Sequence, residues 1–273
     1  MIQFTKMQGT GNDFVVINCL TQNIQNREAL AARLCERRFG IGADQMILLD
    51  ESSSADYRME IYNPDGSQVE MCGNALRAIA LFIHDKGLSA KETHSIDTIG
   101  GLVQTHYVDG LIMIDMGEPN MSVAAIGLTD GEQYLDKTLN VTRDLAVEIT
   151  TVSMGNPHAV IFVDDVETCP LEEVGPLVEN HPLFANRTNV EFIQQIDENT
   201  INMRVWERGT GETLACGSGA CASVVASILN EKTTRDVTVK LRGGDLQISW
   251  DQEDNHVRMK GPAVIVFDGT VSE

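Results

Sequence analysis

The chain has 273 residues, enough for two domains that each bury a core of their own. Its 20 Lys and Arg stand against 40 Asp and Glu, and the net charge of −20 argues against phosphate backbones and anionic membrane surfaces as partners. The N-terminus lacks the basic and then apolar pattern of a signal peptide, and no apolar run approaches the roughly 18 residues of a membrane span. We therefore expect a cytoplasmic protein that binds neither nucleic acid nor membrane.

Short β-rich runs between turn signals predict strands along the whole chain. In chain order these are Phe14–Ile17, Met46–Leu49, Tyr57–Tyr62, Gly110–Met116, Ala159–Val163, Asn202–Trp206, Val237–Leu241 and Val264–Phe267. An amphipathic surface helix is predicted from Arg27 to Arg38, with Leu30, Leu34 and the stem of Arg38 on its buried face.

Two further helices, 74–84 and 218–229, are predicted to be of a different kind. Both are apolar nearly all round, and a helix with such a surface must be enclosed on every side. Each is preceded by a cysteine and a glycine, Cys72-Gly73 in one case and Cys216-Gly217 in the other.

The two cysteines occupy matching places in an internal repeat. Their spacing is 216 − 72 = 144 residues, and the same offset aligns further polar residues with no insertion between them. The aligned pairs are Asn12 with Asn156, Gln45 with Asn189, and Asn63 with Glu207. The chain is therefore predicted to be one structural unit written twice.

These features predict an α+β protein with two pseudo-symmetric domains, each a curled β-sheet wrapped around a central buried helix. We expect the first domain to cover residues 1–117 and the second 118–262. The last strand, within 263–273, is expected to return to the first domain. An active site at the interface would then have one sulfur on each side.

The position of each cysteine suggests its chemistry. A sulfur at the start of a helix lies beside unpaired backbone N–H groups and the positive end of the helix dipole, which favours the thiolate. The same N–H groups can hold a carboxylate. Two such thiols suit removal of a proton from one face of a stereocentre and delivery of another to the opposite face. The other four cysteines, Cys19, Cys35, Cys169 and Cys221, are expected to be thiols without catalytic roles.

Four segments, in this order, resemble the diaminopimelate epimerase family. They are Met7-Gln8-Gly9-Thr10-Gly11-Asn12-Asp13-Phe14, Asn63-Pro64-Asp65-Gly66-Ser67 with Met71-Cys72-Gly73-Asn74-Ala75-Leu76-Arg77, Gly155-Asn156-Pro157-His158, and Glu207 to Gly219 around Cys216. The resemblance implies the epimerisation of LL- to meso-2,6-diaminopimelate, a step of lysine biosynthesis, with Cys72 and Cys216 as the acid/base pair.

The resemblance also implies roles for the surrounding residues. His158 and Glu207 would tune the two sulfurs. The substrate's amino and carboxylate groups would be bound by Asn12, Gln45, Asn63, Asn156, Asn189 and Arg208, and the reacting carboxylate by Gly73, Asn74, Gly217 and Ser218.

No cofactor is expected, because paired thiols need neither pyridoxal phosphate nor a metal. The spacing of Cys and His also matches no usual zinc motif. The expected partner is a small amino-acid substrate, and the resemblance makes a homodimer plausible. Two alternatives stay open: a pyridoxal-phosphate-independent racemase of another amino acid, and a non-catalytic amino-acid-binding or redox-sensing protein.

Overall fold

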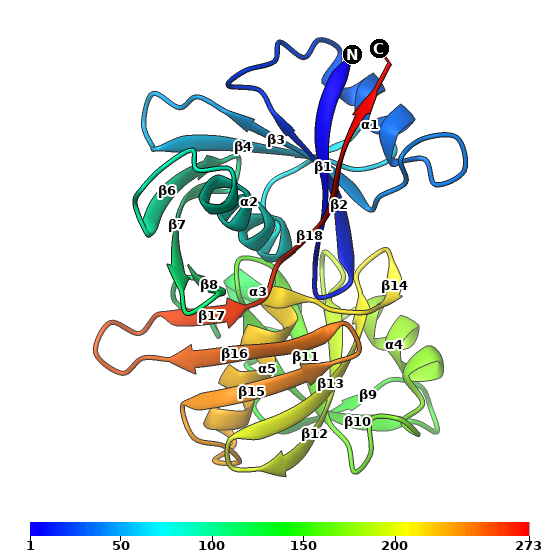
Figure 1. Ribbon diagram of the computed structural model, residues 1–273. Helices are drawn as coiled ribbons and strands as arrows, with labels where there is room; N and C mark the ends of the chain where they lie inside the picture. The colour runs from blue at the N-terminus through cyan, green and yellow to red at the C-terminus, as the bar shows by residue number, and fades with distance from the viewer. Residues whose placement is uncertain (273) are drawn as a thin grey trace. The chain divides into compact units, whose positions relative to one another are not determined.

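The computed structural model describes residues 1–272, which divide into two compact units. Unit 1 consists of Met1–Asp115 together with the chain from Lys260 onward, and unit 2 is Met116–Met259. Figure 1 shows both units, coloured along the chain. No helix among residues 1–272 is both long and apolar enough to cross a membrane.

Up to residue 272, unit 1 contains two helices and nine strands. The helices are α1 (Arg27–Cys35) and α2 (Gly73–Asp85), and the strands are β1 (Ile2–Gly9), β2 (Asn12–Asn18), β3 (Gln45–Asp50), β4 (Tyr57–Tyr62), β5 (Gln68–Val69), β6 (Thr93–Thr98), β7 (Gly101–Val108), β8 (Leu111–Asp115) and β18 (Val264–Val271). The sheet runs β18-β1-β2-β3-β4-β6-β7-β8. The β2/β3 and β4/β6 pairs are parallel, and the other neighbours are antiparallel.

Unit 2 repeats this plan. Its helices are α3 (Val123–Ile126), α4 (Leu171–Glu179) and α5 (Gly217–Leu229), and its strands are β9 (Lys137–Asn140), β10 (Ala146–Ser153), β11 (Pro157–Phe162), β12 (Asn189–Asp197), β13 (Thr200–Glu207), β14 (Gly211–Thr213), β15 (Asp236–Leu241), β16 (Gly244–Trp250) and β17 (Val257–Gly261), which reaches the unit boundary. The order β10-β11-β12-β13-β15-β16 alternates antiparallel and parallel pairs as β1-β2-β3-β4-β6-β7 does.

The register shows how closely the two units correspond. Phe14 pairs with Gln45 where β2 meets β3, and the residues 144 positions later, His158 and Asn189, pair where β11 meets β12. The β4–β5 and β13–β14 hairpins lead into α2 and α5, whose bounds also differ by 144 residues. The repeat is thus present in the backbone as well as in the sequence.

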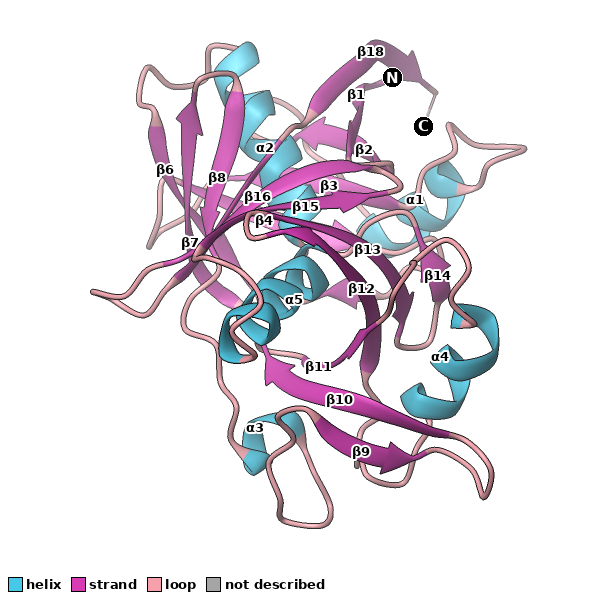
Figure 2. Cartoon of the chain, turned by 90° about the horizontal axis from the view of Figure 1, so that it is seen from below, coloured by secondary structure: helices cyan, strands magenta, loops and turns pink. Residues whose placement is uncertain are grey.

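A curled sheet encloses one apolar helix in each unit. In unit 1, α2 contacts β1, β2, β3, β7, β8 and β18, and in unit 2, α5 contacts β10, β11, β12, β15 and β16. The curl of the unit 2 strands around α5 is visible in Figure 2. Nine residues of α2 and ten of α5 are buried, as the all-round apolar pattern requires. The predicted α+β architecture is confirmed.

One predicted helix is too long. The helix that begins at Arg27 ends at Cys35, because Glu36 has an extended conformation and its carboxylate accepts hydrogen bonds from the backbone N–H groups of Arg38 and Phe39. The carbonyl of Leu34 is satisfied by Ile41 and Gly42 instead of by another helical turn. The stem of Arg38 is exposed, so its predicted place on the buried face is wrong.

Candidate functional site

In unit 1, Cys72 is the N-cap of α2. Its backbone is extended (φ −145°, ψ 117°), and its carbonyl accepts the first helical hydrogen bond, from the N–H of Leu76. The next N–H groups, on Gly73 and Asn74, belong to the first turn, which has no helical acceptors. The Cys72 thiol donates to Asn12 Oδ1 over 3.7 Å. The first predicted cysteine and its partner at the tip of β2 are therefore in contact.

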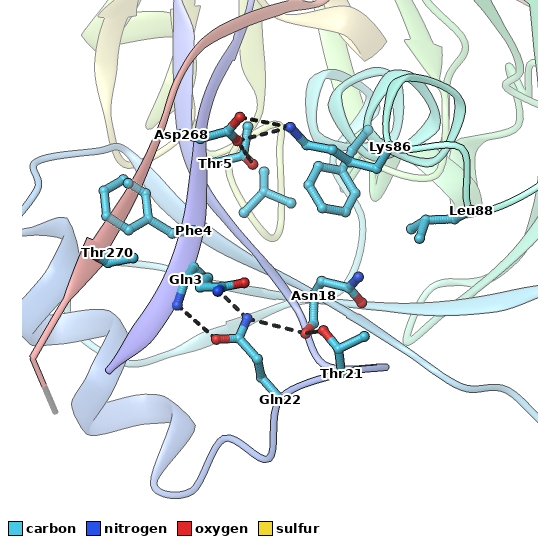
Figure 3. Close-up of a pocket in the computed structure, with 13 residues that line it drawn as sticks. Gln3, Phe4, Thr5, Asn18, Thr21, Gln22, Lys86, Leu88, Asp268 and Thr270 are labelled. Carbon is cyan, nitrogen blue, oxygen red and sulfur yellow. Dashed lines mark hydrogen bonds and ion pairs between the residues drawn. The ribbon is translucent and has the colours of Figure 1, made fainter.

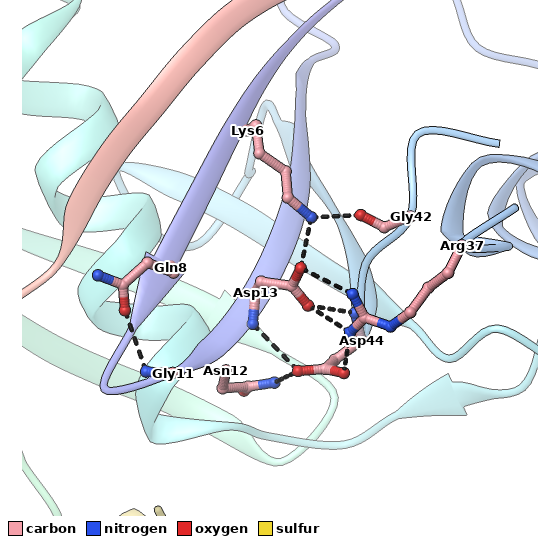
Figure 4. A network of polar contacts seen from close by, with 8 residues as sticks. All are labelled: Lys6, Gln8, Gly11, Asn12, Asp13, Arg37, Gly42 and Asp44. Atoms are coloured by element: carbon pink, nitrogen blue, oxygen red, sulfur yellow. Dashed lines mark hydrogen bonds and ion pairs between the residues drawn. The ribbon is translucent and has the colours of Figure 1, made fainter. Parts of the chain in front are cut away.

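A network of charged groups fixes the amide of Asn12 (Figure 4). Its Nδ2 donates to Asp44 Oδ2 over 3.0 Å, and a carboxylate only accepts, so Oδ1 must be the atom that faces Cys72. Arg37 bridges Asp44 and Asp13, while Lys6 pairs with Asp13 at 2.6 Å. The polar groups beyond Asn12 thus hold an acceptor against the sulfur.

The Asp13 carboxylate makes this network sensitive to acid. Burial alone would raise the pKa of Asp13, but hydrogen bonds from Arg37, Lys6 and the Asp44 N–H outweigh it and lower the pKa far below the usual range. A lowered folded-state pKa contributes stability above the unfolded value of about 3.9, and that stability is lost as the pH falls.

We therefore expect Asp13→Asn to cost roughly 1–2 kcal/mol of unfolding free energy at neutral pH and less on acidification below about pH 4. Urea unfolding of both proteins across pH measures the difference. Asp109→Asn, at an exposed turn of the same unit, is the matched control and should leave the pH profile unchanged. A cost for Asp13→Asn that stays constant from neutral pH to about pH 3 would contradict the expectation.

Gln45 and Asn63 form a second polar pair in unit 1. Gln45 Nε2 donates to Asn63 Oδ1 over 3.1 Å, and Asn63 Nδ2 donates to Ser67 Oγ. Asn63 also closes the turn between β4 and β5, where its carbonyl accepts from the N–H of Gly66. Gln45 Oε1 is buried and accepts no hydrogen bond from any described residue.

The β1–β2 hairpin is held against the first turn of α2. Its two-residue loop, Thr10-Gly11, has φ of 50° and 85°, the pattern of a type I′ turn, in which a β-branched residue is unusual. The Thr10 hydroxyl accepts from Arg77 Nη2 over 3.0 Å, and the same nitrogen donates to Asn74 Oδ1 over 2.8 Å. Arg77 is fully buried in α2, and the apolar pattern of that helix gives no sign of its role.

In unit 2, Cys216 is the N-cap of α5, with nearly the same backbone conformation as Cys72 (φ −125°, ψ 114°). Its sulfur accepts from the N–H of Gly219 over 3.4 Å and lies 3.6 Å from Ser218 Oγ. Only 7% of Cys216 is exposed.

The helix terminus favours the Cys216 thiolate through the N–H of Gly219, as expected, but other groups outweigh it. Burial, followed by the nearby carboxylates of Glu207 and Glu191, raises the pKa of the Cys216 thiol well above its ordinary value. The hydrogen bonds from Ser218 and Gly219 act in the opposite direction and do not compensate. These effects favour the protonated thiol at Cys216.

His158 is connected to Cys216 through the side chains of Asn156 and Ser218. Its Nδ1 is 2.7 Å from Glu191 Oε1, and its Nε2 is 3.0 Å from Asn156 Oδ1. Asn156 Nδ2 in turn donates to Ser218 Oγ over 3.2 Å. Both His158 and Glu191 are fully buried. Glu191 is absent from the predicted set, although the repeat aligns this charged residue with Ile47 and so marks it as unusual.

Glu207 is the second carboxylate near Cys216. Burial raises its pKa, although hydrogen bonds from Thr213 and Cys216 partly oppose the effect.

Asn189 has a structural contact on each side: Nδ2 donates to the Pro157 carbonyl and Oδ1 accepts from the Arg208 N–H. The Arg208 side chain is exposed and donates to the carbonyl of Asn186.

Most predicted site residues therefore gather around the cysteine of their own unit. In unit 1 the structure joins Cys72 with Asn12 and Gln45 with Asn63, and it places Gly73 and Asn74 in the first turn of α2. In unit 2 it joins Cys216, Ser218, Asn156 and His158, with Gly217 at the start of α5 and Glu207 close by.

A pocket of about 580 Å³ in unit 1 is separate from these groups (Figure 3). It is lined by residues of β1, β2, β18 and the end of α2, and in it Lys86 pairs with Asp268. Of the predicted site residues, all of which the structure describes, none lines this pocket. Within residues 1–272, no cluster of three His, Cys, Asp or Glu side chains could hold a metal ion.

Comparison with known proteins agrees with the motif order. Residues 4–122 and 150–266 match the family model of diaminopimelate epimerase. The chain is 45% identical over 280 residues to the diaminopimelate epimerase of Acetivibrio thermocellus, covering 99% of this chain and 98% of the relative. It is 48% identical over 275 residues to that of Moorella thermoacetica, covering 98% of each.

Solved structures at much lower identity share the fold. A phenazine biosynthesis protein of the PhzF family from Bacillus anthracis superposes with a TM-score of 0.72 at 17% identity, covering 100% of this chain and 99% of that one. A probable proline racemase from Agrobacterium radiobacter superposes with a TM-score of 0.71 at 13% identity, covering 100% and 93%.

Proposed function

The chain belongs to the diaminopimelate epimerase family, its activity is that of an isomerase, and we propose that it interconverts LL- and meso-2,6-diaminopimelate with Cys72 and Cys216 as a two-base pair. One observation carries the proposal. Each unit presents a cysteine as the extended N-cap of an enclosed helix, at equivalent positions of the repeat. The proposed active site needs both halves of the chain, since each supplies one thiol.

The proposed reaction conserves protons. One sulfur, as thiolate, takes the α-proton, so a C–H bond breaks, an S–H bond forms, and the electron pair stays on the substrate. The other sulfur, as thiol, delivers its proton to the opposite face of the same carbon, so its S–H bond breaks and a new C–H bond forms. The enzyme finishes with the charge on the second sulfur, ready for the reverse reaction.

The two helix termini provide the stabilisation that this chemistry needs. Charge that develops at the α-carbon spreads into the adjacent carboxylate, and the first-turn N–H groups of α2 and α5 are fixed donors that need no reorganisation. We assign this role to Gly73, Asn74, Gly217 and Ser218. The remaining amino and carboxylate groups of the substrate are assigned to Asn12, Gln45, Asn63, Asn156, Asn189 and Arg208.

The two sulfurs are not equivalent, which suits a reaction that begins with one acid and one base. Burial and the neighbouring carboxylates Glu207 and Glu191 raise the pKa of Cys216, so the proton resides there before substrate binds. In the proposed mechanism Cys72 is then the first base, once it has lost the proton that it donates to Asn12 Oδ1 in the ligand-free protein, and the isomer bound productively is the one whose α-proton faces Cys72. His158 and Glu207 tune Cys216 from within unit 2.

The alternative of a racemase for another amino acid has one observation in its favour, the shared fold with a probable proline racemase. An exposed Arg208 and several amide side chains fit a substrate with a second amino-acid end better than they fit proline. A cytoplasmic location and assembly as a homodimer remain proposals, and light scattering of the purified chain tests the second.

Proton NMR of the reduced protein with LL-2,6-diaminopimelate in deuterium oxide tests the proposed function. We expect deuterium to enter one α-position as the meso isomer appears, without added cofactor. A parallel panel of proline, hydroxyproline and histidine should show no exchange. Exchange of proline with none of diaminopimelate would replace the proposal with the racemase alternative. No exchange in any substrate, with the thiols confirmed to be reduced, would favour a binding or redox-sensing protein.

A further inference from the structure

A continuous chain of hydrogen bonds leads from a buried carboxylate in unit 2 to the Cys216 sulfur. It begins at Glu191 Oε1, passes through both nitrogens of His158, crosses the amide of Asn156 and reaches the Ser218 hydroxyl, which touches the sulfur. Its successive distances are 2.7, 3.0, 3.2 and 3.6 Å. We refer to it as the Glu191 chain.

The direction of the hydrogen bonds in this chain depends on how many protons His158 carries. If both ring nitrogens of His158 carry protons, Glu191 Oε1 accepts at one of them and Asn156 Oδ1 accepts at the other. With its oxygen turned to the ring, the amide of Asn156 donates to Ser218 Oγ. The hydroxyl proton of Ser218 is then left to point at the Cys216 sulfur, beside the N–H of Gly219.

The chain would run the other way if His158 carried one proton. With its remaining proton on Nδ1, Nε2 would accept, the amide of Asn156 would turn over, and the Ser218 hydroxyl would donate to the amide oxygen. The Ser218 oxygen could then only accept from the Cys216 thiol. The protonation of His158 therefore decides whether Ser218 stabilises a thiolate or a thiol at Cys216.

We propose that Glu191 is a positioning residue: by keeping His158 doubly protonated, it directs the Ser218 hydroxyl proton toward the Cys216 sulfur and so stabilises the thiolate that this cysteine must become in each catalytic cycle. The inference rests on the proposed function, because it needs Cys216 to act as a base in one direction of the reaction. Glu191 itself acts through His158 and Asn156 without touching the sulfur.

The internal repeat separates this role from a purely structural one. The positions 144 residues earlier, Phe14 and Ile47, are fully buried and apolar, so the same place in the same fold needs no charge to be stable. The helix also makes room for the carboxylate: a Cβ at Gly219 would lie 2.6 Å from Glu191 Oε1. Glu191 Oε2 is buried and accepts no hydrogen bond from the described residues. Burying this atom lowers the stability of the fold, and no hydrogen bond from a described residue offsets the loss.

Glu191→Gln tests the proposal with two independent measurements. Nitrogen-edited NMR of His158, recorded without substrate at neutral pH, should change from a doubly protonated ring to one with a single proton on Nδ1. For epimerisation, kcat should fall about tenfold, the equivalent of one hydrogen bond to a charged group, while KM changes less than about twofold. Removing the negative charge of Glu191 would by itself lower the pKa of Cys216 and favour its thiolate. A fall in kcat would therefore come from the loss of the Ser218 hydroxyl as a donor to the sulfur.

Ser218→Ala breaks the same chain at its other end and guards against a folding defect in the first variant. Its kcat should fall by a similar factor while His158 stays doubly protonated. Because both residues act through one chain, the double variant should lose little more than either single variant. Glu212→Gln, which removes a carboxylate paired with Arg204 in the same unit, is the control and should leave the NMR signals of His158 unchanged.

Two results would overturn the proposal. One is a doubly protonated His158 in Glu191→Gln, and the other is a double variant whose loss equals the product of the two single losses. Since the ring is examined without substrate, the NMR result stands even if diaminopimelate proves not to be the substrate.

Discussion

Cys72→Ala and Cys216→Ala are each expected to lower kcat for epimerisation by at least roughly a thousandfold, which is within the range that a positioned general acid or base contributes. In the proposed mechanism each sulfur serves one face of the α-carbon, so neither can replace the other. The loss should appear in both directions of the reaction, because the base of one direction is the acid of the other. Rates of isomer interconversion, measured by NMR for each starting isomer, check this.

Two matched controls separate catalysis from the mere loss of a buried thiol. Cys221 lies in α5, just over one turn beyond Cys216, and Cys35 lies in α1. The Cys221→Ala and Cys35→Ala variants should both keep most of the activity. Ultraviolet absorbance of the thiolate gives an independent measurement, because Cys216→Ala should remove none of it at neutral pH, where burial and Glu207 keep that thiol protonated. A Cys72→Ala or Cys216→Ala variant that retained a tenth of the activity would contradict the two-base mechanism.

Arg77→Met is expected to lower the free energy of unfolding by about 3–5 kcal/mol, among the largest single-residue effects for this fold. Met keeps much of the side-chain volume but removes the guanidinium, which donates to Pro262 O, Thr10 Oγ1 and Asn74 Oδ1. These acceptors would be left without that donor, and the left-handed conformation of Thr10 would lose the contact that offsets its strain. Urea unfolding followed by circular dichroism measures the loss.

Arg38→Met provides the comparison for that loss, because Arg38 is exposed just beyond α1 and its replacement should change stability by no more than about 0.5 kcal/mol. Equal small effects of the two substitutions would show that the buried guanidinium of Arg77 contributes nothing net to folding.

The repeat made much of the fold predictable, and it also predicts an element that hydrophobic patterning misses. Shifting the predicted helix 27–38 by 144 residues gives 171–182, which contains α4 at 171–179; hydrophobic patterning alone missed this helix because Pro176 lies inside it. Strands such as β6, β7 and β16 were missed because they are short of contiguous apolar residues. The strand pairings are not visible in local sequence, since they join segments far apart.

The site residues that belong to the repeated motifs could be predicted from the sequence. The protonation of a site residue could not, because it depends on how deeply the residue is buried. The ordered motifs gave Cys72 and Cys216, and the structure places Asn12 and Asn156 at equivalent points of the two units. The protonation of Cys216 depended on how many carboxylates come near it once it is buried, which helix position alone could not tell. The contacts of Glu191 with His158 and of Asp44 with Asn12 are visible only in the three-dimensional packing.

The path of the chain sets the order in which the two units can be completed during synthesis. Unit 2 is one uninterrupted segment, whereas the sheet of unit 1 ends with β18, which pairs with β1 so that Val271 lies opposite Ile2. Unit 2 can therefore finish folding before β18 has paired with β1 and completed the sheet of unit 1. This is the reverse of the usual order, in which the N-terminal domain folds first. Until β18 leaves the ribosome, β1 is an exposed edge strand, open to chaperones and to mispairing.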